Sequence, residues 1–270
     1  MIKNFYTTAW VAAMSLALFS GAAQAGRSCE AAKQPPPQTI EKAMTLAERT
    51  MRTLDAEYAK NGTKVVVLAR AGTDLSKYGL RYSHLGLAYK NTDGQWLVAH
   101  KLNTCGTADA ALYRQGLGEF FLDDLFRYEA AWSIPTKDAQ DKLHALLMDN
   151  ARTIALNTKA YSMVSYVWGQ KYQQSNQWAL ETIAMAMESG VQNRQQAQAW
   201  LQFKGYEPTT LKIGPLTRLG GRVTSANIAF DDHPNEKRYS DRIESVTVDS
   251  MFAWLQRSGL GAAPVSFRLY

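Results

Sequence analysis

The amino-acid sequence predicts an α+β domain with an antiparallel sheet, a buried central helix and flanking helices. A helical segment and three β-prone segments come first, and several helical segments follow, so strands and helices do not alternate. One of the later helical segments is apolar on most sides, which is typical of a helix at the centre of a core. The length of 270 residues is sufficient for one large domain.

The first 25 residues have the pattern of a cleaved secretory signal. Lys3 is their only charged residue, Ala9 to Phe19 is an apolar run, and Ala23-Gln24-Ala25 has the small-x-small form of a signal peptidase site. The run is too short to span a bilayer comfortably, and no other stretch approaches about 20 apolar residues. We therefore expect cleavage near Ala25, a single domain over residues 26–270, and a periplasmic or secreted protein without a transmembrane segment.

The charge of the expected mature chain is mildly positive. Removing Lys3 from the 30 basic residues leaves 29 against 24 acidic ones, a net charge of +5, and the basic residues form no cluster. Such a charge argues neither for nor strongly against nucleic acid, and we expect no nucleic-acid partner. His233 lies in a turn-rich stretch, but no spacing of histidines, cysteines and carboxylates resembles a metal site. We expect neither a metal nor another cofactor.

Two cysteines, Cys29 and Cys105, are present, and both lie in the expected mature chain. In an oxidising compartment the pair predicts a disulfide. Such a bridge would tether the N-terminal tail and its Pro35-Pro36-Pro37 run across a long loop. The alternative makes Cys105 a catalytic thiol, and it requires that Cys29 is unpaired.

The N-terminal half of the mature chain predicts a helix, a buried strand and a hairpin. After Thr39 as a candidate N-cap, apolar residues recur at steps of three and four as far as Asn61-Gly62. Val65 to Ala69 is a continuous apolar run, which is typical of a buried strand. Two β-prone segments then form the hairpin: Tyr82 to Tyr89 and Gln95 to Leu102.

The C-terminal half predicts four helices with short β-prone pieces between them. The helices are Thr136 to about Asn150, Asn176 to Glu188, Gln195 to Phe203, and Asp249 to Arg257. The second of these is the apolar one, and we expect it to be central to the core. The β-prone pieces are Thr210 to Ile213 and Arg222 to Ala229.

Whether His84 and His100 share a face of the hairpin depends on its loop length, because a slip of one residue moves a side chain to the other face. A two-residue loop, Asp93-Gly94, would put them on opposite faces. A three-residue loop, Thr92 to Gly94, would make them diagonal neighbours on one face. The sequence favours the longer loop, since Asn91 suits the first position of a type I turn and the final glycine suits the left-handed position.

Ser175 lies where a polar loop passes into the apolar helix. As an N-cap it would contribute about 1 kcal/mol to helix stability. As a nucleophile it would need a base and an orienting group, which two histidines on one face can supply. The backbone N–H of Asn176 would then help to bind an oxyanion. The residues alone leave both interpretations open.

Several motifs resemble the bacterial domain-of-unknown-function family 2145. They are Ala69 to Leu75, Arg81 to Gly86, Tyr172 to Trp178, Ala197 to Leu201, and Asp231 to Pro234. Together they cover most of the mature chain in order. This resemblance identifies relatives but implies no activity.

A broader resemblance concerns the arrangement of His84, His100 and Ser175. A strand with His-x-Gly, a second strand ending in a polar residue and a later helix headed by a nucleophile are similar to circularly permuted papain-like hydrolases of the NlpC type, and to lecithin:retinol acyltransferase-like enzymes. The resemblance implies a papain-like fold, with His84 as general base, His100 as orienting group and position 175 as nucleophile. It also implies a cysteine at that position, in Asn-Cys-Asn-Gln-Trp, where this chain has serine.

The replacement of a thiol by a hydroxyl bears on activity, because a hydroxyl needs a well-placed base and oxyanion hole throughout. We therefore expect an exported cell-envelope protein that binds a ligand or is an inactive descendant. Its partner would be a peptidoglycan peptide, an acyl-lipid or an envelope protein. Three aromatic residues are candidates for its cleft: Tyr82, Tyr172 and Trp178.

The alternative is an amide or ester hydrolase, or an acyltransferase, that uses Ser175, His84 and His100. A third interpretation is that the histidines serve only stability.

Overall fold

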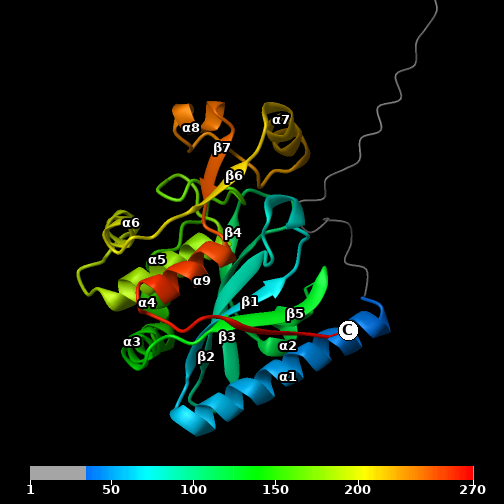
Figure 1. The fold of residues 1–270 in the computed structure, drawn as a ribbon, viewed down its shortest axis with the longest axis vertical. Helices are drawn as coiled ribbons and strands as arrows, with labels where there is room; N and C mark the ends of the chain where they lie inside the picture. Colours follow the sequence, from blue (N-terminus) through cyan, green and yellow to red (C-terminus); the bar gives the residue numbers. More distant parts are fainter. Residues whose placement is uncertain (1–34, 124, 270) are drawn as a thin grey trace, which may run out of the picture.

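The computed structural model describes residues 35–123 and 125–269, and its centre is a six-stranded antiparallel sheet (Figure 1). The strand order is β4-β3-β2-β1-β5-β8. The strands are β1 (Val65–Ala71), β2 (His84–Lys90), β3 (Trp96–Asn103), β4 (Ala110–Gly116), β5 (Arg127–Ser133) and β8 (Val265–Arg268). The predicted α+β class with an antiparallel sheet is confirmed. The predicted signal lies outside the described residues.

The hairpin between β2 and β3 has the predicted three-residue loop. Lys90 pairs with Trp96, and the N–H of Asn91 donates to the carbonyl of Gln95 at 2.8 Å. Gly94 has φ 77°, a left-handed conformation that glycine adopts without strain. The Asn91 side chain accepts from the N–H of Gln95. The register that follows brings His84 and His100 to the same face, as the turn residues predict.

Two helices cover one face of the sheet, α1 (Pro37–Asn61) and α2 (Leu117–Phe121). Helix α1 begins at Pro37, two residues before the predicted cap, because proline in the first turn lacks only an N–H that has no helical partner. Its buried residues are Ala43, Leu46, Ala47, Thr50 and Leu54. Met44 and Met51 stand among the apolar residues that recur at steps of three and four, yet both are exposed. The buried face of α1 is thus rotated away from both methionines. It consists of smaller side chains than the periodicity alone indicates.

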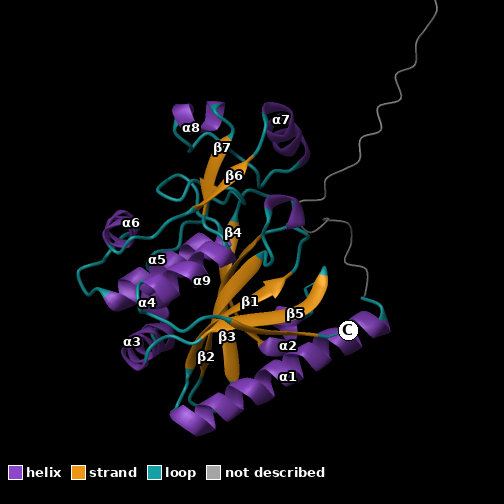
Figure 2. Cartoon of the chain, viewed as in Figure 1, coloured by secondary structure: helices purple, strands orange, loops and turns teal. Residues whose placement is uncertain are grey.

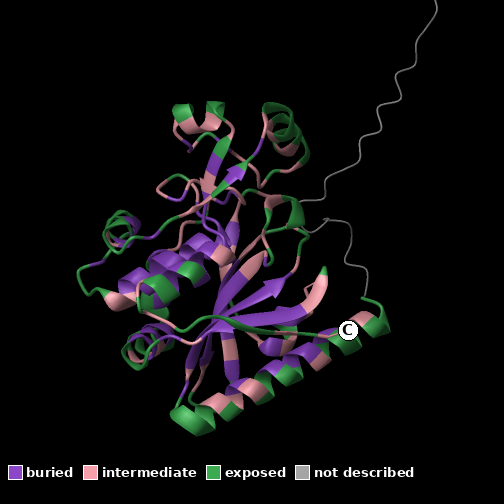
Figure 3. Cartoon of the chain, viewed as in Figure 1, coloured by how far each residue is buried: buried purple, intermediate pink, exposed green. Residues whose placement is uncertain are grey.

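The opposite face of the sheet carries the main core, with α5 at its centre (Figures 1 and 3). Around it lie three further helices: α3 (Lys137–Met148), α6 (Arg194–Phe203) and α9 (Val248–Arg257). Helix α5 (Ser175–Met187) is buried from Ser175 through Met185. The predicted buried central helix is therefore confirmed. The predicted Thr136 cap is also confirmed, since its side chain accepts from the N–H of Ala139.

A smaller lobe lies at one end of the molecule (Figure 2). It consists of a two-stranded sheet, β6 (Thr209–Lys212) and β7 (Arg242–Ser245), with α7 (Pro215–Thr224) and α8 (Asn235–Tyr239). The predicted β-prone piece over 222–229 is wrong. Proline at the first helical position starts α7, and the helix runs through the first residues of that piece.

Two short elements complete the described chain, η1 (Ser76–Tyr78) and α4 (Asn150–Ile154). Among the helices of residues 35–123 and 125–269, none has the length and apolar content to cross a membrane.

Candidate functional site

The candidate site lies where β2 and β3 separate. The two strands pair from Lys90 and Trp96 only as far as Leu87 and Ala99. Beyond this point the N–H of Leu85 donates to the Asn176 side-chain oxygen at 3.1 Å. The first turn of α5 is therefore held beside the start of β2, which is the strand that begins with His84.

His84 and His100 form a hydrogen-bonded pair on adjacent strands. His84 Nε2 lies 2.9 Å from His100 Nδ1, and the ring centroids are 5.2 Å apart. Gly86 makes this pairing sterically possible. A Cβ at Gly86 would lie 2.4 Å from Val98 Cγ1 and 3.0 Å from His100 Cβ. Only glycine fits beside the His100 ring without moving a neighbouring strand.

Gln115 on β4 sets the proton positions in the pair. His100 Nε2 lies 2.8 Å from the Gln115 side-chain oxygen, which can only accept a hydrogen bond. His100 Nε2 therefore carries a proton, and Nδ1 of the neutral ring accepts one from His84 Nε2. This assignment leaves the lone pair of His84 Nδ1 without a hydrogen-bond partner among the described residues. The chain from Gln115 to His84 orients one basic nitrogen.

The surroundings of the pair disfavour its protonation. Burial, followed by the charge of Arg70, lowers the pKa of His100 to about 4. The same two causes, in the same order, hold the pKa of His84 well below its usual value. The Arg70 guanidinium lies 4.6 Å from the centroid of the Phe120 ring, against which both histidines pack, and it pairs with Asp123. Both imidazoles are therefore neutral at pH 7.

Ser175 is the first residue of α5 rather than its N-cap. The N-cap is Gln174, whose side-chain oxygen accepts from the N–H of Asn176. The Ser175 side chain is near enough to the Tyr161 hydroxyl to lower its pKa, although burial has the larger effect and raises it. Within the described residues, no hydrogen bond joins Ser175 to His84 or to the second histidine. The predicted cap is displaced by one residue because a longer side chain reaches back over the first turn.

Asn176 also departs from its predicted role. Its backbone N–H, the expected oxyanion donor, lies 3.2 Å from the Gln174 side-chain oxygen and donates to it. The amide group of Gln174 is held in place by Ser245 and Val246. An incoming oxyanion would have to displace this intramolecular acceptor.

Two of the three aromatic residues predicted to line a cleft are buried. The Trp178 side chain is completely buried in the main core, where a ligand cannot reach it. Tyr82 is also buried, and its hydroxyl donates to Glu129 at 2.7 Å. Tyr172 alone of the three is partly exposed. Trp178 is inaccessible because its place in the first turn of α5 points it between the sheet and the surrounding helices.

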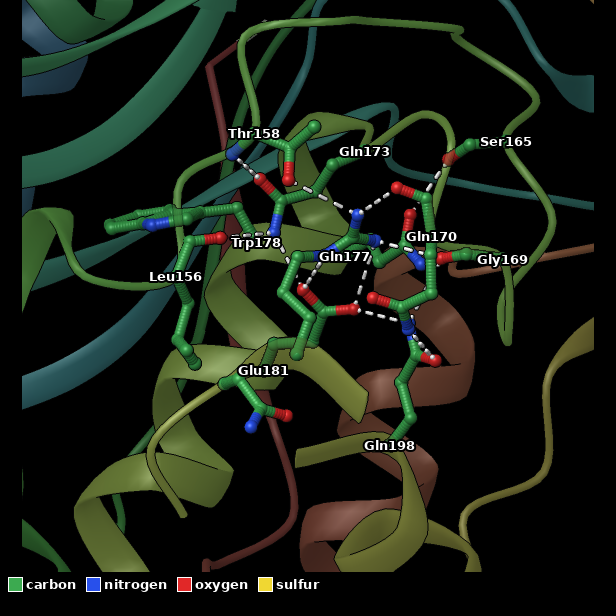
Figure 4. Close-up of polar contacts among 12 residues, drawn as sticks. Leu156, Thr158, Ser165, Gly169, Gln170, Gln173, Gln177, Trp178, Glu181 and Gln198 are labelled. Carbon is green, nitrogen blue, oxygen red and sulfur yellow. Dashed lines mark hydrogen bonds and ion pairs between the residues drawn. The ribbon is translucent and has the colours of Figure 1, made fainter. Parts of the chain in front are cut away.

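A buried polar network surrounds the start of α5 (Figure 4). Glu181 accepts from Gln173, Gln198 and the guanidinium of Arg194, with a closest Arg194 contact of 2.8 Å. Arg194 also donates to three backbone carbonyls of the loop before α5, those of Gly169, Gln170 and Tyr172. The network therefore fixes the loop that leads to Ser175.

Lys101 extends this network from β3. Its ammonium nitrogen lies 2.8 Å from the Gln173 side-chain oxygen and also donates to the carbonyl of Thr158. Burial, followed by the charge of Arg194, lowers the pKa of Lys101 to about 7. Sequence reasoning missed these residues, although one signal was present. A glutamate inside an apolar helix indicates a buried partner.

The predicted disulfide involves a residue outside the described chain. Cys105 follows β3, whereas Cys29 lies outside residues 35–123 and 125–269. The pairing therefore stays a prediction. The described residues contain no group of three or more His, Cys, Asp or Glu side chains arranged to hold a metal ion.

Comparison with known proteins identifies relatives by family alone. No curated protein and no solved structure matches the chain. The model of a family described as uncharacterized proteins conserved in bacteria, DUF2145, matches residues 57–255. The matched region contains Ser175, both histidines and the polar network behind α5. The chain therefore belongs to the bacterial family DUF2145.

Proposed function

We propose that this protein is an exported cell-envelope protein with a papain-like fold of the permuted NlpC type, in which the catalytic centre has become a non-catalytic binding site. Ser175 occupies the nucleophile position, and the site holds a peptidoglycan peptide, an acyl-lipid or a segment of an envelope protein. The protein acts by binding and does not turn over its ligand.

The observation that carries this proposal is that no hydrogen bond joins Ser175 to His84 or His100 in the described residues. The Ser175 side chain lies near the buried hydroxyl of Tyr161. A serine nucleophile depends on a base that removes its proton, whereas a thiol is already partly ionised at neutral pH. A serine without a hydrogen bond to either imidazole lacks that activation.

Two further features support a site without turnover. The N–H of Asn176 is occupied by Gln174, which removes a donor that a tetrahedral intermediate would use. The low pKa of His84 also makes the imidazole a weak proton acceptor. General bases work best when their pKa lies near the operating pH.

The second candidate function is the amide or ester hydrolase, or acyltransferase. One observation favours it, namely the chain from Gln115 through His100 to His84, which leaves His84 Nδ1 unpartnered among the described residues at the start of the strand beside α5. Ligand binding would then have to bring the Ser175 hydroxyl within hydrogen-bond distance of this nitrogen.

A fluorophosphonate probe separates the two candidates. We expect no labelling of the wild-type protein, and the variant Ser175→Ala serves as the blank. Labelling that is present in the wild type and lost in Ser175→Ala would establish the hydrolase and contradict the proposal.

Restoring a thiol tests the origin of the site. In Ser175→Cys we expect alkylation by iodoacetamide at a rate that falls when His84→Ala is added, because a neighbouring imidazole promotes thiolate formation. The wild type, treated in the same way, controls for the two native cysteines. If the introduced thiol is alkylated at the same rate with and without His84→Ala, the idea of a former catalytic pair is contradicted.

Binding is measured by co-sedimentation with peptidoglycan sacculi and with acyl-lipid vesicles, and by cross-linking in the envelope. We expect the affinity for the bound partner to be unchanged in Ser175→Ala, because binding without turnover does not require the nucleophilic hydroxyl.

A further inference from the structure

Helix α7 presents its apolar side chains to solvent. Leu216, Leu219 and Val223 are 84%, 59% and 77% exposed. Their spacing of three and four residues puts them in one stripe along the helix. None of the residues of α7 is buried, and Figure 3 shows the helix as largely exposed at the end of the molecule.

The opposite side of α7 attaches the helix to the smaller lobe. Arg218 donates to the carbonyl of Ile213 and pairs with Asp241, which precedes β7. Gly221 faces Ile228 so closely that a Cβ would lie 3.3 Å from its side chain. A helix on a globular protein normally turns its apolar stripe inward and its polar side outward. In α7 this arrangement is reversed, because the apolar stripe faces solvent and Arg218 faces the lobe.

Three exposed cations of the smaller lobe have no acidic partner among the described residues. Arg222 lies in the same helix between Leu219 and Val223, and it is exposed. Lys212 on β6 and Arg242 on β7 are exposed and directly opposite each other in the register. Among the described residues, no ion pair involves any of the three cations. Like charges opposite each other on a sheet are unfavourable unless an anionic group lies nearby.

We propose that the α7 stripe docks on an anionic lipid surface, with the leucines and the valine among the acyl chains and the three cations at the headgroups. An exposed apolar stripe flanked by basic residues is the pattern of a helix that lies in a membrane interface. Tyr239 on α8 in the same lobe is 70% exposed and has the amphipathic character of interfacial aromatics.

A lipid surface fits the stripe better than a protein partner does. Three aliphatic side chains form a small patch, whereas a stable protein interface buries about 800 Å² per partner. The unpaired cations also match the negative potential of an anionic bilayer, where each contributes to binding. The stripe lies in the smaller lobe, outside the groups around Ser175, so this inference does not depend on the proposed function.

The test is co-sedimentation with vesicles of phosphatidylcholine alone and with vesicles that contain about 30% phosphatidylglycerol. We expect binding to the anionic vesicles that weakens as salt is added. The pair Leu216→Ser and Val223→Ser should reduce it about tenfold or more, because both side chains leave water on docking. The matched control is Phe203→Ser, which removes an apolar side chain that is 81% exposed on α6.

The charge arm uses Arg222→Gln and Lys212→Gln, with Lys60→Gln at the end of α1 as the control. We expect the first two to weaken binding and its salt dependence, and the control to leave both unchanged. Residues 1–25 are identical in all variants, so differences among them report on α7 and not on the leader.

Three outcomes would overturn the inference. The first is no binding of the wild type to anionic vesicles. The second is equal binding by the stripe variants and the Phe203→Ser control. The third is a wild-type dimer in light scattering that becomes monomeric in the stripe variants, which would make the stripe an interface between two copies of this chain.

Discussion

The histidine pair shows how neighbouring side chains set the chemistry of a residue. His84 and His100 are close enough to share a proton, yet burial and the Arg70 guanidinium keep both rings neutral. Gln115 accepts a hydrogen bond from His100 Nε2 at the far end of the chain and so fixes the tautomer of each ring. The same groups that orient His84 therefore also lower its basicity.

This arrangement predicts a loss of stability in mild acid. The unfolded histidines take up protons near pH 6.5, whereas the folded pKa of His100 is about 4. The stability that the neutral rings contribute is thus complete above pH 6.5 and is lost as the pH falls toward 4. For His100 the loss approaches about 1.4 kcal/mol per pH unit.

Urea unfolding at neutral and mildly acidic pH measures this effect. The variant His100→Gln should show a smaller decrease in unfolding free energy than the wild type over the same pH interval. Equal decreases in the two proteins would mean that His100 titrates as it does in the unfolded chain.

Gly86 carries a second prediction for a single residue. Gly86→Ala should lower the unfolding free energy by about 1–3 kcal/mol, because the added methyl group overlaps Val98 and crowds His100. Thermal or urea unfolding measures the change. The control is Gly220→Ala in α7, where a Cβ meets nothing within 4 Å and alanine favours the helix. Equal effects at the two positions would contradict the steric explanation.

Among the secondary-structure elements, α5 is held by polar contacts as well as by apolar packing. The pair of Glu181 and Arg194 joins α5 to α6, and Arg194 fixes the preceding loop through its backbone carbonyls. Both side chains are almost completely removed from solvent. A buried charge that loses its partner is strongly destabilising, whereas the intact pair contributes little net stability to the fold.

Removing one partner should therefore be more damaging than removing both. We expect Arg194→Met to lower the unfolding free energy by about 3–5 kcal/mol, because Glu181 is left buried without its cation. The double variant with Glu181→Leu should recover part of the loss. A double-mutant cycle from urea unfolding gives the coupling, and Lys142→Met in the exposed pair with Asp138 should change little. Additive losses at the buried pair would contradict this view.

For the whole molecule, the first prediction concerns export. Expression with the complete sequence in a bacterium should yield a periplasmic or secreted protein whose mass begins near Gly26, because residues 1–25 have the form of a signal. Intact-mass measurement and cell fractionation test both points. A cytoplasmic protein that retains the first 25 residues would show that the pattern is not a cleaved signal.

The second molecular prediction concerns the cysteines. In the exported protein we expect Cys29 and Cys105 to be bridged, which would close a long loop and stabilise the fold by about 4–5 kcal/mol in the chain-entropy model. Mass spectrometry of the non-reduced protein after alkylation counts free thiols. Two free thiols would exclude the bridge.

The predictable parts of the fold are those with local causes. The three-residue turn at Thr92 to Gly94 depends on residues next to it, and it determines the register of β2 and β3. The central helix is recognisable because its residues are apolar on most sides. Strands β4, β5 and β8 were missed, since their polar and mixed residues acquire a strand conformation only through pairing with distant neighbours.

The candidate site divides in the same way. The sequence by itself determined that His84 and His100 share a face and that Ser175 stands at the start of a buried helix. Only the tertiary structure decided that Ser175 makes no hydrogen bond to either histidine in the described residues and that Gln174 occupies the Asn176 N–H. Turn and helix signals act over a few residues, whereas the partners of a buried polar group depend on which distant segments the packing brings together.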